Sequence, residues 1–170
     1  MSTVIMHCVV SVDGFIADEK DEVGPLFDWY GNGDVPIVEG SSMKISPISA
    51  GYVQPMWASV RSMVIGRHLF DITNGWEGTP PTGDHVVVVS HRGRPAGWHP
   101  EASYFFIDDV ARAVAKAREL AGDGVVAVAA GDVGRKPGDP GRPRAAPALP
   151  GQEPGLTPRL PGRAGDFLYQ

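Results

Sequence analysis

The composition of the chain changes abruptly near residue 130, and this change limits how much of it can fold. Glycine and proline fill 16 of the last 40 positions, about 40% against the ~12% of ordinary proteins. No window of that stretch has the period of a strand or a helix. Residues 1–130 instead contain apolar runs typical of an α/β domain. We therefore expect one folded, incomplete domain over residues 1–134 and an irregular Pro/Gly/Arg-rich tail over residues 135–170.

The charge is also unevenly distributed along the chain, whose net charge is -5. Residues 131–170 carry six basic and four acidic side chains, whereas residues 1–130 carry nine basic and sixteen acidic ones. The excess of acidic side chains in residues 1–130 argues against nucleic acid as the main partner. The basic excess of the tail is too dilute for a nucleic-acid-binding arm.

The expected compartment follows from what the sequence lacks. Cys8 is the single cysteine, so no disulfide can form within the chain, and a reducing cytoplasm fits. The N-terminus has no basic region of a signal peptide. No run approaches the ~20 apolar residues of a membrane helix. We expect a cytoplasmic protein with no membrane contact.

Apolar strands alternate with helices along the first 130 residues. Strands are expected at 4–10, 63–65, 85–89, 104–107 and 125–129, and helices at 52–62, 67–72 and 108–121. Pro55 would lie in the first turn of helix 52–62. The last helix is capped by Asp108 or Asp109, ends at Gly122, and has Val110, Val114, Ala117 and Ala121 on one face. This order predicts a sheet that is at least partly parallel and covered on both faces, with ligands at the carboxyl ends of its strands.

Residues 18–50 are rich in Gly, Pro, Asp and Ser, with aromatic residues between them. A long loop over a ligand cleft has this composition, and so does a variable surface insertion. Both interpretations remain open from the sequence.

Polar residues follow strand 63–65, where a parallel sheet would bind a ligand. Gly66 has no side chain, so a ligand can approach its backbone closely. Free N–H groups at the start of the following helix attract phosphate. Arg67 adds a positive charge that is suited to a phosphate partner. His68 follows directly. The plainer interpretation is a turn with a solvated arginine.

Strand 85–89 is followed by three polar residues, Ser90, His91 and Arg92. Their side chains are suited to binding a nucleotide 2′-phosphate. A polar loop explains them equally well. His68 and His91 lack the spacing of metal ligands on a helix, so no metal site is predicted. Ser90 and His91 are also sequence neighbours, which is not how nucleophilic triads are built.

Two more segments follow the last and the first expected strand. Ala130 and Gly131 are small enough to let a pyrophosphate approach the backbone, although simple strand termination explains them too. Asp13, in the segment SVDGFIA at 11–17, places a carboxylate on a tight turn where it could move a proton or orient a substrate. The alternative is an ordinary Asp-Gly turn.

Taken in order, these segments resemble the dihydrofolate-reductase-like superfamily. The nearer resemblance is to its bacterial branch related to the reductase domain of riboflavin biosynthesis. It covers about residues 3–134 and is carried by SVDGFIA at 11–17, FDWY at 27–30, IGRHLFDI at 65–72, GW at 75–76, VVSHR at 88–92, and AGDGVVAVAA at 121–130 behind helix 108–121.

The resemblance implies a three-layer α/β/α domain with a mostly parallel central sheet that binds NADPH. It implies that Asp13 is catalytic and faces the nicotinamide and the substrate, which Ser11, Gly14 and Phe15 contact. The residues that it implies for the cofactor are Gly66, Arg67, His68, Ser90, His91, Arg92, Ala130 and Gly131. The implied reaction is hydride transfer to a small heterocycle, such as 5-amino-6-(5-phosphoribosylamino)uracil or dihydrofolate.

The chain departs from the family pattern in three places. Leu69 stands where the family has threonine, and Ala130 stands where it has glycine; both predict weaker cofactor binding. The closing helix and strands of the family are missing from residues 131–170. The missing strands also predict an exposed sheet edge and a weakened homodimer.

The tail itself has two interpretations. Gly, Pro, Arg and Ala are what GC-rich codons yield in a shifted reading frame, so the tail fits a frameshift. The rival interpretation is a genuine disordered arm, because Pro-rich segments of low hydrophobicity cannot repay the entropy of ordering. Three functions follow: an NADPH-dependent reductase, a non-catalytic NADP-binding or interaction protein, and an inactive truncated or frameshifted product.

Overall fold

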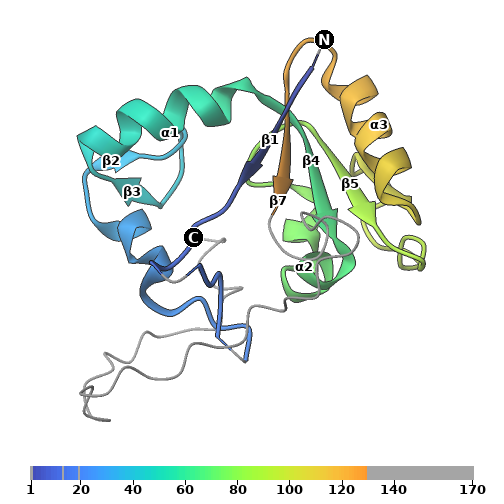
Figure 1. Ribbon diagram of the computed structural model, residues 1–170, viewed down its shortest axis with the longest axis horizontal. Coiled ribbons are helices and arrows are strands. Elements are labelled where there is room, and N and C mark those ends of the chain that lie inside the picture. Colours follow the sequence, from blue (N-terminus) through green and yellow to red (C-terminus); the bar gives the residue numbers. More distant parts are fainter. Residues whose placement is uncertain (1, 13, 19, 130–170) are drawn as a thin grey trace.

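Five parallel strands form the central sheet (Figure 1). The computed structural model describes residues 2–12, 14–18 and 20–129. Across the sheet the order is β1 (Thr3–His7), β7 (Val125–Ala129), β4 (Val60–Gly66), β5 (His85–Val89) and β6 (Tyr104–Ile107). All four pairings between neighbours are parallel, so all five carboxyl ends lie at one edge of the sheet. The predicted parallel sheet is confirmed.

The apolar composition of the strands explains why they occupy the centre. In β5, Val86, Val87 and Val88 are fully buried, which is typical of a parallel strand that is covered on both faces. Strands β5, β6 and β7 have the predicted bounds. Strand β4 begins at Val60, three residues earlier than expected, and β1 ends at His7, three residues earlier than expected.

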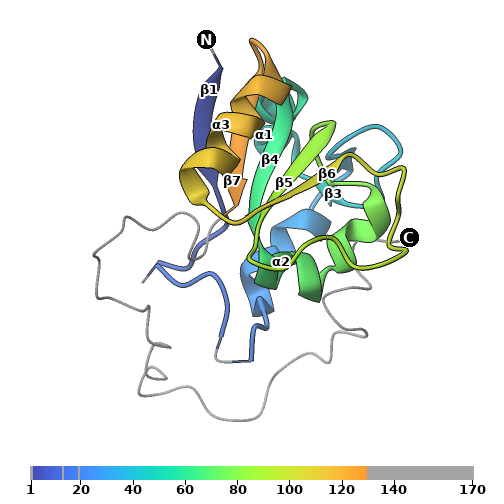
Figure 2. The same cartoon turned by 90° about the vertical axis from the view of Figure 1, so that its right-hand side faces the viewer.

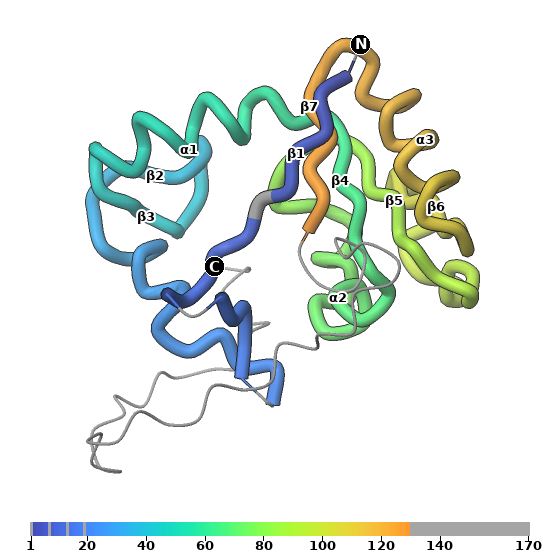
Figure 3. The backbone as a smooth tube through the Cα atoms, viewed as in Figure 1, coloured from blue at the N-terminus to red at the C-terminus, as the bar shows by residue number. Residues whose placement is uncertain are grey.

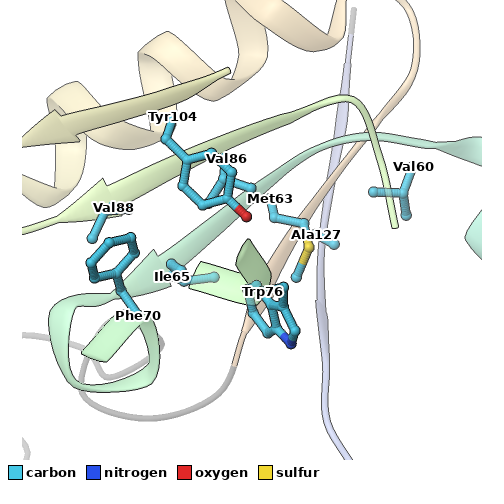
Figure 4. Packing of buried hydrophobic residues seen from close by; sticks show 9 residues of the cluster. All are labelled: Val60, Met63, Ile65, Phe70, Trp76, Val86, Val88, Tyr104 and Ala127. Carbon is cyan, nitrogen blue, oxygen red and sulfur yellow. The ribbon is translucent and has the colours of Figure 1, made fainter. Parts of the chain in front are cut away.

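Helices cover both faces of the sheet, which confirms the predicted three-layer α/β/α arrangement. On one face, α3 (Val110–Ala121) packs through its alanines against Val64, Val87, Val126 and Val128. On the other face, α2 (Arg67–Ile72) contributes Phe70 and the 3-10 turn η2 (Asn74–Gly78) contributes Trp76 (Figure 4). Figures 1 and 2 show α2 at the carboxyl-end edge of the sheet.

Helix α3 has the predicted caps and most of the predicted buried face, with Ala117 and Ala121 buried and Val114 half-buried. The Asp109 carboxylate accepts a hydrogen bond from the N–H of Arg112 at 2.8 Å, and Gly122 ends the helix with φ +57°. The buried line consists of Ala113, Ala117 and Ala121. Val110 was expected on this face and is instead 45% exposed at the first position of the helix.

The prediction of a long loop over residues 18–50 is wrong. This segment contains the 3-10 helix η1 (Gly24–Gly31) and a two-stranded hairpin, β2 (Val35–Pro36) with β3 (Lys44–Ile45). Together with α1 (Pro47–Ser59) they enclose a small separate core of Ile37, Ile45, Ala50 and Trp57. Figure 3 shows this unit to one side of the sheet.

The start of α1 also differs from the prediction. The helix begins at Pro47, where the ring's fixed φ and missing N–H are tolerated. The Ser46 hydroxyl caps it by accepting a hydrogen bond from the N–H of Ser49 at 3.2 Å. Pro55, which was expected in the first turn, therefore lies inside the helix.

Several predictions concern residues beyond the described part. Asp13, Ala130, Gly131, the tail 135–170 and the loss of the closing strands lie outside the described residues. Within those residues, no helix has the length and apolar character to cross a membrane, and no group of metal-ligating side chains gathers.

Candidate functional site

The carboxyl ends of β4 and β5 bring two of the predicted phosphate segments together. The two strands are neighbours, with Gly66 opposite Val89. Arg67 therefore leaves β4 beside the residues that leave β5. Its Nη1 atom lies 3.5 Å from the Oγ of Ser90. Arg67 thus meets Ser90 and Arg92, from which it is separated by 23 and 25 positions in the sequence.

Arg67 is held rigidly in this cluster. Its Nε donates to Asp71 Oδ1 at 2.7 Å, and its Nη1 donates to the carbonyl oxygens of Arg92 at 3.4 Å and Gly93 at 3.2 Å. The guanidinium carbon lies 5.3 Å from the centre of the Phe70 ring, within the range of a cation–π contact. Only 18% of the side chain is exposed.

Asp71 joins the two arginines, and sequence reasoning missed it. One carboxylate oxygen accepts from Arg67, and the other accepts from Arg92 Nη2 at 2.9 Å. Arg92 is otherwise open to solvent, with 69% of its side chain exposed. The spacing of Arg67 and Asp71 on a short helix, i and i+4, is the signal that could have identified the carboxylate.

The Ser90 hydroxyl shapes the loop after β5. It donates to the Arg92 carbonyl at 2.7 Å and accepts from the Arg92 N–H at 3.0 Å. The side chain is nearly buried. Its hydroxyl therefore already holds the backbone of Arg92 in a local turn.

His68 makes its hydrogen bond outside the arginine cluster. His68 Nε2 is 3.0 Å from Asp21 Oδ2, and both side chains are exposed. This pair ties α2 to the loop after β1, where the Asp18 carboxylate accepts from the N–H groups of Lys20 and Glu22. These two hydrogen bonds hold the pKa of Asp18 below its ordinary value. His91 is exposed, and its predicted role stays a prediction.

The turn after β1 is closed by its own residues. The Ser11 N–H donates to the Phe15 carbonyl at 2.8 Å, and the Phe15 N–H donates to the Ser11 hydroxyl at 2.9 Å. Gly14 has φ +87°, a conformation that favours glycine. Substrate contact by Ser11, Gly14 and Phe15 stays a prediction.

Two aromatic residues of η1, Trp29 and Tyr30, pack against the small core. The rings of Trp29 and Tyr30 stack with centroids 4.1 Å apart. Burial raises the pKa of Tyr30 to about 12, so its phenol stays neutral at physiological pH and is not a general base there.

A shallow open groove of about 430 Å³ lies at the opposite end of the sheet. It is lined by the start of β4, the loop before β5 and α1, including Trp57, Arg61 and Asp84. Among the described residues, none of the predicted site residues lines it. We place the candidate site at the carboxyl ends because charged groups converge there and ligands bind there in parallel sheets.

The donor set at the carboxyl ends fits a phosphate group. Two guanidinium groups face one carboxylate, which leaves an excess of one positive charge, and Arg92 presents its guanidinium to solvent. Gly66 is the N-cap of α2, with an extended backbone. Helix α2 has only six residues, so its dipole contributes little and the arginines are the main attraction for an anion.

Comparison with known proteins gives a weak likeness. No family model matches the chain, and no curated protein is significantly similar to it. Among the matching solved structures is a "putative riboflavin biosynthesis protein" from Shewanella sp. PV-4, which is 20% identical over 77% of this chain with a TM-score of 0.48. The match spans 66% of that protein's length. At this similarity no activity or residue role is transferred.

Proposed function

We propose that the chain is an NADPH-dependent reductase of the dihydrofolate-reductase-like superfamily. The observation that carries the proposal is the meeting of Arg67, Ser90 and Arg92 at the carboxyl ends of two neighbouring parallel strands. The ordered sequence motifs and the three-layer α/β arrangement support it. The coarser proposal, an anion-binding α/β domain, rests on the arginine cluster alone.

The proposed cofactor, NADPH, supplies a hydride when it is bound. In this proposal the arginine cluster binds its 2′-phosphate, which directs the rest of the molecule along the carboxyl ends of the strands. The turn around Gly14, with Asp13, would contact the substrate and hold or move its proton. The substrate class is a small heterocycle, such as a ribosylaminouracil or dihydrofolate, and the proposed compartment is the cytoplasm.

The experiment is a titration of the full chain with NADPH, followed by measurement of NADPH oxidation with each proposed substrate. Saturable binding with turnover is the expected result. Saturable binding without turnover on any of them would favour the non-catalytic NADP-binding alternative. Absence of saturable binding would contradict both proposals and favour the inactive product.

The matched control is Arg61→Ala, because Arg61 is an exposed arginine at the opposite end of β4. Arg92→Ala should weaken NADPH by about 10- to 100-fold, the value of one charge-assisted contact. Arg61→Ala should leave it unchanged. Equal weakening by both substitutions would indicate nonspecific attraction of the ligand to positive charge.

A further inference from the structure

Asparagine occurs at two positions of the chain, Asn32 and Asn74, and glycine follows it at both. Glycine has no side chain to shield its backbone nitrogen, and its backbone is the most flexible of all residues. The nitrogen of such a glycine can reach the side-chain carbonyl carbon of the asparagine before it, which is the first step of deamidation. The two positions share this intrinsic chemistry, so the fold decides which of them reacts.

The side-chain amide of Asn74 is held at both of its polar atoms. Its Nδ2 donates to Glu77 Oε1 at 2.7 Å, and its Oδ1 accepts from Trp98 Nε1 at 3.2 Å. The next residue, Gly75, is buried, and its carbonyl accepts from the Tyr104 hydroxyl at 2.8 Å. A rotation that brings the Gly75 nitrogen to the side-chain carbon of Asn74 must first break these contacts.

Asn32 lies in a looser setting at the end of η1. It is exposed and is the C-cap of that helix, where its backbone N–H donates to the Trp29 carbonyl at 3.5 Å. Within the described residues, its side-chain amide makes no hydrogen bond. The amide of Asn32 can therefore turn toward the next backbone nitrogen without giving up a side-chain contact.

The segment after Asn32 also opens more easily than the segment after Asn74. Gly33 packs against the backbone of Ile45 with no room for a Cβ, so ring closure at Asn32 requires the hairpin of β2 and β3 to move. That hairpin has two residues in each strand, and such short pairings belong to the least stable parts of a fold. Buried Gly75 has no comparable freedom.

We propose that Asn32 is a site of spontaneous deamidation in the folded protein and that Asn74 is protected from it. The Gly33 nitrogen attacks the side-chain carbonyl carbon of Asn32. The new N–C bond forms, the bond to the amide nitrogen breaks, and ammonia leaves with the proton of the Gly33 N–H. Water then opens the cyclic imide at either carbonyl, which gives aspartate or isoaspartate. The reaction needs no oxidant, reductant or cofactor, so it does not depend on the proposed function.

Both products add a negative charge at the junction between η1 and the hairpin. Isoaspartate also inserts a methylene group into the main chain directly before Gly33, which is packed tightly on Ile45. Its formation should therefore loosen the small core of η1, the hairpin and α1 and leave the central sheet intact. Hydrogen exchange of the aged protein should become faster in residues 24–59 and stay unchanged in residues 85–89.

The direct test is incubation of the full chain in mildly alkaline buffer, followed by mass spectrometry of its peptides. Conversion replaces the amide by a carboxyl group, and chromatography separates aspartate from isoaspartate. Asn32 should convert at least about 10-fold faster than Asn74, because two hydrogen bonds hold the amide of Asn74. In urea the two rates should become similar, since glycine follows both residues.

Glu77→Ala tests why Asn74 is protected. It removes the acceptor of Asn74 Nδ2 and should accelerate conversion of Asn74 by about 10-fold, with the rate at Asn32 unchanged. Glu77→Gln is the matched control, because it keeps an oxygen acceptor and should accelerate conversion less. An unchanged rate at Asn74 in Glu77→Ala would refute the protection by these hydrogen bonds.

The comparison within wild-type protein needs no variant to fold. Equal conversion of the two asparagines in the folded chain would overturn the proposal, and so would faster conversion of Asn74. Conversion of both in urea but of neither in the folded chain would also overturn it, because the fold would then protect both positions. Absence of conversion in either state would do the same.

Discussion

Four consecutive residues from Asn74 to Glu77 have positive φ, at 47°, 55°, 48° and 50°. Gly75 is suited to this region and Asn74 tolerates it, whereas Trp76 and Glu77 adopt it at a cost. The Tyr104 hydroxyl donates to the Gly75 carbonyl at 2.8 Å, and Trp76 is buried in the main core. Side-chain contacts thus compensate for unfavourable backbone geometry, which local propensity alone would not predict.

Gly75→Ala should destabilise the protein by about 2–4 kcal/mol. A Cβ at this position would lie 2.6 Å from the rings of both Phe70 and Trp98. The control is Gly122→Ala, where φ is also positive but nothing lies within 4 Å; it should cost only about 1–2 kcal/mol. Urea unfolding of both variants measures the difference, and equal losses would show that packing around Gly75 is unimportant.

His99 provides a prediction about pH. Its Nε2 lies 3.0 Å from Glu77 Oε2, and this hydrogen bond raises the pKa of His99 above its ordinary value of 6.5. Because the folded-state pKa is raised, the contribution to stability is fully present below the unfolded value and is lost as pH rises through the folded one. An NMR titration of the imidazole should give a pKa above 6.5 that falls in Glu77→Gln, and an unchanged value in that variant would refute the pairing.

Among the elements, those built from continuous apolar runs were predictable. The predicted bounds are correct for four elements: strands β5, β6 and β7 and helix α2. Turn-forming residues flank each of these segments and so mark where it begins and ends. Strands β2 and β3 were missed, since two residues each are too few to show a period. The expected helix 52–62 starts five residues later than α1. The expectation puts Pro55 in the first turn, where proline is best tolerated, and overlooks Ser46-Pro47 as a helix start.

The cap of α1 can be tested directly. Ser46→Ala removes the hydroxyl that accepts the Ser49 N–H and should cost about 1 kcal/mol of unfolding free energy. Ser59→Ala, at the other end of the same helix, removes an exposed hydroxyl that donates to the Met56 carbonyl and should cost less. A smaller loss in Ser46→Ala than in Ser59→Ala would show that the helix does not depend on its cap.

At the scale of the whole molecule, the site depends on strand order that no local pattern reveals. The sequence placed Arg67 and Ser90–Arg92 at strand ends, but only the adjacency of β4 and β5 makes them neighbours. The spacing of Arg67 and Asp71 is a local signal for their pairing, but the second bond of Asp71, to Arg92, could not be predicted because it spans 21 positions. Within the described residues β1 pairs only with β7, and its Val4 and Met6 side chains are exposed.

The central claim is that NADPH binds across the carboxyl ends of β4 and β5. Hydrogen–deuterium exchange of the full chain, with and without saturating NADPH, tests it directly. The account predicts slower exchange in residues 66–71 and 89–93 and no change in residues 81–84, which line the groove at the opposite end. Protection confined to residues 81–84, or protection nowhere, would contradict it.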